Sequence, residues 1–99
     1  MKNMNANIPT STRRKVYARD GYRCALCDST RYIQIHHVIP RGQGGSDFAE
    51  NLITLCSVCH GQAHGINVYA HPDFDAEKVS QDCVEYVSDF YAGDWYPFK

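Results

Sequence analysis

Residues 24–27 read CALC, residues 35–40 read IHHVIP and residues 51–60 read NLITLCSVCH, and these three stretches decide the fold. A gap of two residues between cysteines lets one turn direct both sulfurs at a single ion, and two such turns complete a tetrahedron. Because a closed four-thiolate site has no open position, its ion should hold the fold and not catalyse. The pattern therefore predicts a structural zinc site whose ligands are Cys24, Cys27, Cys56 and Cys59.

Length and composition favour one small domain. The 99 residues bury only a modest core, so a metal staple is expected. Residues 1–7 contain no secretion signal, and no apolar run approaches the length of a membrane span. We therefore expect a cytoplasmic protein with no membrane partner, in which paired cysteines stay reduced and bind metal. The fifth cysteine, Cys83, lies on the apolar face of a predicted helix and is expected in the core.

The net charge of −1 hides a strong asymmetry along the chain. Residues 1–45 carry eight basic and two acidic side chains, a net charge of +6, whereas residues 46–99 carry two basic and nine acidic ones, a net charge of −7. This distribution suits a protein that offers one basic face to a polyanion. Two solvated surfaces that partly pair with each other would give the same pattern, so charge alone leaves both interpretations open.

Capping residues, β-branched runs and glycines predict a small α+β domain with a ββα unit at its centre. We expect a flexible arm at residues 1–9, a main domain at 10–70 and a helical extension at 71–99 packed on the same domain. The expected elements are a helix from Ser11 or Thr12 to Arg19, strands at 32–38 and 52–55, a glycine-rich loop at 40–47, a helix at 58–64 capped by Ser57, a long helix at 75–92, and an aromatic tail at 95–98 that folds back over that helix.

The histidines of this region suit a second metal site. His60 and His64 are four residues apart on a predicted helix, so they share a face and can chelate one ion. His36 and His37 are adjacent on a predicted strand, where neighbouring side chains point to opposite faces. One of them can bind a metal while the other acts as a base only if the backbone bends there. His71, which precedes a proline, is interpreted as an ordinary loop residue.

Taken together, these motifs resemble the HNH endonuclease family and its ββα-metal fold. The resemblance covers about Arg14 to Gly65, half of the chain. It includes the paired histidines before Val-Ile-Pro, the glycine-rich loop, the Glu-Asn-Leu-Ile block at 50–53, the Cys-His pair at 59–60 and the embedded Cys-x-x-Cys pairs. As a set these features are specific, whereas each one alone would be weak.

The resemblance implies a role for each matching residue. His37 matches the general base that takes a proton from the attacking water, and Asn51 matches the residue that braces the loop carrying the base. His36 matches the strand ligand of a catalytic metal, where many members have Asp. His60 matches the ligand on the helix, and His64 matches a further helix ligand that only some members have.

The implied activity is hydrolysis of phosphodiester bonds in DNA, by nicking or double-strand cleavage, with 5′-phosphate and 3′-hydroxyl products. A histidine titrates near neutral pH and can activate water, and one divalent ion with open positions can stabilise the phosphate. Imidazole ligands suit Zn²⁺, Ni²⁺, Co²⁺ or Mn²⁺, and Mg²⁺ is also possible with few protein ligands. The basic residues expected to contact phosphates are Arg14, Arg19, Arg23 and, nearest the predicted site, Arg41.

Two other interpretations stay open at this stage. A four-cysteine zinc domain could bind nucleic acid without cutting it, with the histidines as structural groups. Alternatively, the nuclease could be a subunit of a larger phage packaging or restriction assembly, or a homodimer, that docks through its acidic second half. The resemblance places such proteins in bacteria, phages and mobile elements, and so in a bacterial or phage-infected cell.

Overall fold

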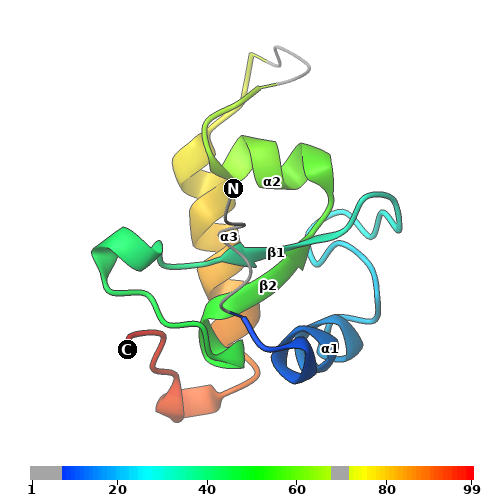
Figure 1. Cartoon of the computed structure of the whole chain (residues 1–99). Helices are drawn as coiled ribbons and strands as arrows, with labels where there is room; N and C mark the ends of the chain where they lie inside the picture. Colours follow the sequence, from blue (N-terminus) through cyan, green and yellow to red (C-terminus); the bar gives the residue numbers. More distant parts are fainter. Residues whose placement is uncertain (1–7, 68–71) are drawn as a thin grey trace, which may run out of the picture.

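The computed structural model describes residues 8–67 and 72–99, and it shows a small α+β fold, as expected (Figure 1). A two-stranded antiparallel sheet lies at the centre, with α3 behind it and α1 below it in the view of Figure 1. The elements in chain order are α1 (Thr10–Arg19), β1 (Gln34–His37), the 3-10 turns η2 (Arg41–Gln43) and η3 (Ala49–Asn51), β2 (Leu52–Leu55), α2 (Ser57–Ala63), α3 (Ala76–Ser88) and η4 (Ala92–Asp94).

The register of the sheet places the paired histidines opposite β2. His36 pairs with Ile53 and His37 pairs with Leu52. All four residues of β2 are buried, so this strand lies in the core and β1 pairs along its edge. The backbone bends at Val38 and Ile39, directly after β1, and the chain then makes the long loop at 40–50. This bend lies immediately after the paired histidines.

Apolar side chains form two clusters, one associated with each part of the fold. The larger cluster contains buried residues of β2 and α3 together with three cysteines, which are Cys24, Cys56 and Cys59. The smaller cluster lies beside α1 and consists of Ile8, Val16, Ile35 and Leu52. Both clusters include residues of β2, so this strand connects the region of the paired cysteines with the N-terminal helix α1.

Arg19 and Asp20 attach the end of α1 to β2. The Arg19 guanidinium donates to the carbonyl of Leu52 at 2.6 Å and to that of Ala49 at 2.9 Å. The buried Asp20 carboxylate accepts from Arg19 and from the Thr54 amide at 2.9 Å. This paired and hydrogen-bonded charge cluster gives α1 a fixed place although the helix has only one buried side chain, Val16.

Several element boundaries differ from those expected. The predicted arm covered residues 1–9, of which 1–7 lie outside the described residues; Ile8, however, is only 3% exposed and packs in the smaller cluster. The first strand begins at Gln34, because Tyr32 has a φ of +52° and its side chain is 76% exposed. The last helix ends at Ser88, before the predicted 92. His71 lies outside the described residues.

The aromatic tail was expected to cover the last helix, and the structure shows a further contact. Trp95 packs against the larger cluster, which includes Cys83 and Val87 of α3. Phe98, in contrast, forms an isolated antiparallel bridge with Gly45 in the 40–50 loop. The tail therefore joins α3 to that loop.

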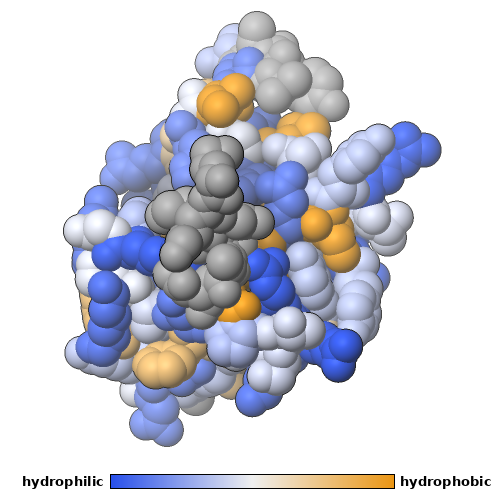
Figure 2. Space-filling view, viewed as in Figure 1, coloured by the Kyte–Doolittle hydropathy of each residue, from blue (hydrophilic) through white to orange (hydrophobic). Residues whose placement is uncertain are grey.

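None of the helices in the described ranges is long and apolar enough to cross a bilayer. The face shown in Figure 2 is mostly hydrophilic, with apolar residues in small separate patches.

Candidate metal centres and active site

The four cysteines predicted as zinc ligands lie together. Their four Sγ atoms all lie within 4.8 Å of one another. The Cys56 thiol also begins α2, since it accepts a hydrogen bond from the Cys59 amide at 3.4 Å. Burial, and then the neighbouring Cys24, raise the pKa of Cys59 above its ordinary value, so a cation is needed before all four can be thiolates. Number, donor type and spacing fit a zinc site.

Cys83 lies near this group but does not belong to it. It is 1% exposed and packs in the larger cluster with Cys24, as expected for a core residue. Burial, followed by the charges of Asp82 and Cys24, raises its pKa to about 12. A protonated thiol in this place behaves as a small apolar side chain.

A second cluster joins β1 with α2 and consists of His36, His60 and His64. One ring nitrogen from each of the three lies within 4.8 Å of the others, and the ring centroids are 4.9 to 5.2 Å apart. Burial, and then the neighbouring His60 and His64, lower the pKa of His36 to about 3. Burial also lowers the pKa of His60. Neutral imidazole is the form that binds metals, so this cluster suits a divalent ion.

Gln34, which the sequence analysis did not single out, contacts this cluster. Its side-chain oxygen lies 2.5 Å from Nδ1 of His60. Gln34 and His36 are two residues apart on β1 and so lie on the same face. Because the amide oxygen only accepts, Nδ1 of His60 donates, and Nε2 keeps the lone pair that a metal requires. Only the alternation of the strand could have indicated this residue from the sequence.

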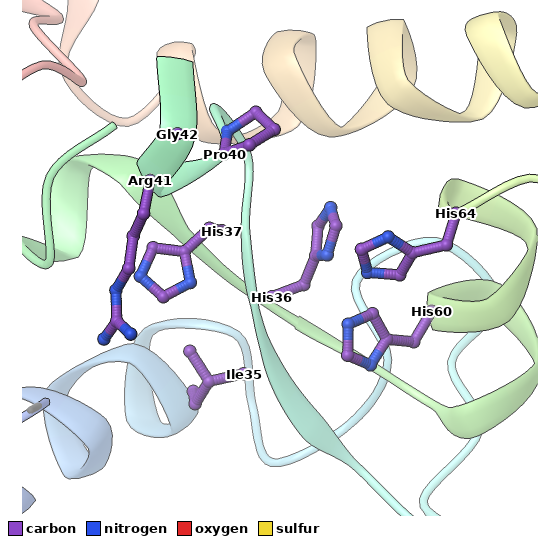
Figure 3. A pocket seen from close by; sticks show the side chains of 8 residues that line it. All are labelled: Ile35, His36, His37, Pro40, Arg41, Gly42, His60 and His64. Atoms are coloured by element: carbon purple, nitrogen blue, oxygen red, sulfur yellow. The ribbon is translucent and has the colours of Figure 1, made fainter. Parts of the chain in front are cut away.

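His37 lies on the other side of β1 from the three-histidine cluster, next to Arg41 (Figure 3). Its Nε2 is 2.7 Å from Oδ1 of Asp47, and Nε of Arg41 donates to the same oxygen at 2.9 Å. Burial alone would raise the pKa of Asp47, but the hydrogen bonds from His37 and Arg41 outweigh it and hold this pKa below its ordinary value. An ionised Asp47 accepts a hydrogen bond from the Nε2–H group, which leaves Nδ1 of His37 as the acceptor. Asp47 is the second residue that the sequence analysis missed.

Asn51 holds the loop that carries Arg41 and Asp47. Its fully buried side chain donates to the carbonyls of Ile39 and Ser46, each at 2.9 Å, and its oxygen accepts from the Ile39 amide at 2.7 Å. Gly45 crosses this point so closely that a Cβ on it would lie 1.8 Å from the Ile39 carbonyl oxygen. Only glycine fits there, and Asn51 connects the two ends of the loop.

One open cavity of about 330 Å³ is lined by residues from both sides of β1. Figure 3 shows its lining residues, which belong to β1, α2 and the turn η2 or, for Pro40 and His64, directly adjoin η2 and α2. Its lining includes the three-histidine cluster as well as His37 and Arg41. A phosphate group in this cavity could therefore contact a metal-binding group, a base and a cation at once.

The other predicted phosphate contacts are placed differently. Arg14 is exposed on α1. Arg23 is 57% exposed and lies 3.6 Å from Asp28. Arg19 is only 12% exposed and is engaged with Asp20, main-chain carbonyls and the ring of Phe90, so we leave it out of the substrate contacts proposed below.

Comparison with known proteins supports the family resemblance. Residues 24–65 match the family described as HNH endonuclease, which confirms the resemblance seen in the sequence, although over a shorter range. Residues 24–65 are called the HNH segment below, after the family that they match. This segment contains both Cys-x-x-Cys pairs, the four histidines that line the cavity, and Asn51.

Three relatives match part of the chain. The chain is 44% identical over 39 residues to the type IV methyl-directed restriction enzyme EcoKMcrA of Escherichia coli, and 44% identical over 43 residues to the probable mobile endonuclease E of Enterobacteria phage T4. It is 37% identical over 46 residues to anaredoxin of Nostoc sp.. These matches cover 39%, 43% and 46% of this chain and 14%, 30% and 60% of the relatives, in the same order. The chain thus spans less than two thirds of each of them.

Proposed function

We propose that this protein is a metal-dependent endonuclease that hydrolyses phosphodiester bonds in DNA. The family match and the two endonuclease relatives support nuclease activity in general. The observation that carries the finer proposal is the shared cavity, where His37, hydrogen-bonded to a carboxylate, lines the same space as the three-histidine cluster.

The catalytic ion would be held by His36, His60 and His64. When bound, such an ion supplies positive charge for the phosphate and for the departing oxygen. The chain itself sets the protonation of two of these ligands. Burial lowers the pKa of His36 and so keeps its ring neutral, and Gln34 fixes the proton of His60 on Nδ1. An all-nitrogen donor set favours Zn²⁺, Ni²⁺, Co²⁺ or Mn²⁺ over Mg²⁺. The Cys24, Cys27, Cys56 and Cys59 site would hold a separate structural zinc ion.

His37 is the proposed general base. Its Nε2 donates to Asp47, so Nδ1 is free to accept a proton from a water molecule in the cavity. The proton then stays on Nδ1, and the adjacent Asp47 carboxylate offsets the positive charge of the ring. Arg41, which lines the same cavity, is placed to contact the phosphate. Attack on phosphorus with loss of the 3′ oxygen leaves a 5′-phosphate and a 3′-hydroxyl end.

Plasmid cleavage tests this proposal. Protein loaded with one equivalent of zinc is mixed with supercoiled DNA, and Mg²⁺, Mn²⁺, Ni²⁺, Co²⁺ or Zn²⁺ is added singly. We expect nicked or linear product from the wild type and none from His37→Ala, whose zinc content and thermal unfolding should match the wild type. No cleavage by folded, zinc-loaded wild type with any ion would contradict the proposal and favour a non-catalytic nucleic-acid-binding module. Wild-type rates in His37→Ala would remove the role given to His37.

A further inference from the structure

The residues at 95–99, called here the 95–99 segment, lie outside the HNH segment at 24–65 but pair with its loop. The Ser46 amide donates to the Pro97 carbonyl at 2.9 Å, and the Lys99 amide donates to the Gly44 carbonyl at 3.0 Å. The Trp95 indole donates to the Glu50 carbonyl at 2.6 Å. Three hydrogen bonds thus connect five consecutive residues with both halves of the 40–50 loop.

The position of these bonds relative to Asp47 is what matters. Ser46, whose amide is bonded to the segment, directly precedes Asp47, and Glu50 follows it by three residues. Ser46 is also the residue whose carbonyl accepts from Asn51. Its peptide groups are therefore held by Asn51 on one side and by the 95–99 segment on the other. Asp47, at 34% side-chain exposure, has no comparable burial to fix it.

We infer that the 95–99 segment is a positioning element of the active site, which holds the 40–50 loop so that Asp47 stays at hydrogen-bond distance from Nε2 of His37. This inference rests on the proposed nuclease function, because it assigns the segment a role in orienting the base. Next to Asp47, Asn51 holds the loop from within the HNH segment and the 95–99 segment holds it from outside. With the 95–99 segment loosened, the loop keeps its chain path but loses the fixed place of Asp47.

The Lys99 amide allows a test with a matched control. Lys99→Pro removes the N–H that donates to Gly44, whereas Lys99→Ala keeps it, and both variants lose the same side-chain charge. We expect Lys99→Pro to lower kcat between about ten-fold and a hundred-fold, because small displacements of a catalytic group are costly. KM and the affinity of the three-histidine cluster for Ni²⁺, measured by calorimetry, should stay within about two-fold of those of Lys99→Ala.

A double substitution shows whether the segment acts through Asp47. In an Asp47→Asn background, Lys99→Pro should cause no further loss of kcat, since the contact that it supports is already impaired. An equal loss in both backgrounds, a kcat like that of Lys99→Ala, or a loss explained by weaker Ni²⁺ binding would each overturn the inference. Trp95→Phe, which removes the bond to Glu50 and keeps an aromatic ring, should show the same pattern as Lys99→Pro.

Nuclear magnetic resonance of the His37 ring separates this inference from the proposed function. Under mildly alkaline conditions, the ring nitrogens of wild type and of Lys99→Ala should report a proton fixed on Nε2, whereas Lys99→Pro should show a mixture of tautomers. This result would support the positioning role even if the wild type cuts no DNA. Identical ring spectra in all three proteins would contradict the role even if the nuclease is active.

Discussion

At the scale of single residues, the hydrogen-bond partner of one ring nitrogen determines what the other ring nitrogen of His37 and of His60 can do. His37 faces a carboxylate and His60 faces an amide oxygen, at 2.7 and 2.5 Å. Each partner selects which ring nitrogen carries the proton, and so which nitrogen remains an acceptor. The same side-chain type can therefore serve as the proposed base in one case and as the proposed metal ligand in the other.

Asp47→Asn should lower kcat by at least about ten-fold while KM changes little. The amide keeps the size of the side chain but loses the negative charge that stabilises a protonated His37. Steady-state cleavage of a labelled duplex measures both constants. The same substitution should also release the proton that Asp47 fixes on Nε2 of His37, so an unchanged His37 ring spectrum by nuclear magnetic resonance would show that Asp47 acts by another route.

Asn51→Ala should destabilise the fold by roughly 2–4 kcal/mol, because it leaves the Ile39 and Ser46 carbonyls and the Ile39 amide without this partner in a buried place. Urea unfolding of the zinc-loaded protein measures this change. Gln43→Ala, in an exposed part of the same loop, is the control and should stay within about 0.5 kcal/mol of the wild type. Equal stability of the two variants would contradict the bracing role of Asn51.

His36 should make the fold sensitive to acid. Its pKa is lowered from the ordinary 6.5 to about 3 by burial and then by His60 and His64. Between these values the unfolded chain binds a proton that the folded chain does not, so stability contributed by this group is complete above pH 6.5 and is lost as the pH falls. In protein with one equivalent of zinc, the melting temperature of wild type should therefore fall more from pH 7 to pH 5 than that of His36→Asn. Parallel curves would contradict this prediction.

At the scale of elements, sequence patterns predicted those parts that local chemistry determines. β2 and α2 were expected at 52–55 and 58–64 and occur at Leu52–Leu55 and Ser57–Ala63, because a β-branched run and then a capping position mark them. The cap is nevertheless the Cys56 thiol and not Ser57. The α2 histidines and the four cysteines were likewise readable from their spacing.

Contacts between distant residues were not readable in this way. Asp47 looked like any acid in a glycine-rich loop, and its place at His37 depends on the path that Gly45 and Asn51 give to that loop. Arg19 was predicted to be a surface cation that contacts phosphates. Its guanidinium is instead turned inward, where it binds Asp20 and two main-chain carbonyls. The bridge from Phe98 to Gly45 spans half of the chain and leaves no periodic signal.

The Cys-x-x-Cys elements should depend on zinc, and Cys56→Ser tests this dependence. Serine still offers an oxygen to cap α2, but it replaces one of four thiolates, so the loss should be in metal binding rather than in helix capping. We expect Cys56→Ser to lose bound zinc on dialysis and to unfold at a lower temperature. Cys83→Ser, at a buried cysteine outside the four-cysteine zinc site, should keep one zinc ion per chain. Loss of zinc by both variants would contradict the assignment of ligands.

At the scale of the whole molecule, the charge asymmetry becomes a testable statement about substrate binding. Exposed arginines of the basic half include Arg14 on α1 and Arg23 shortly after this helix, whereas the acidic half includes α3 with Lys78 paired to Asp82. If the basic half tracks phosphates, each lost contact should lower the slope of log affinity against log salt by about 0.9 for duplex DNA. Fluorescence anisotropy with a labelled duplex, using His37→Ala to prevent cleavage, should show this change for Arg14→Ala and Arg23→Ala. Lys78→Ala removes the same charge from the acidic half and should leave the slope unchanged; equal effects at all three positions would mean that only net charge matters and that no basic face exists.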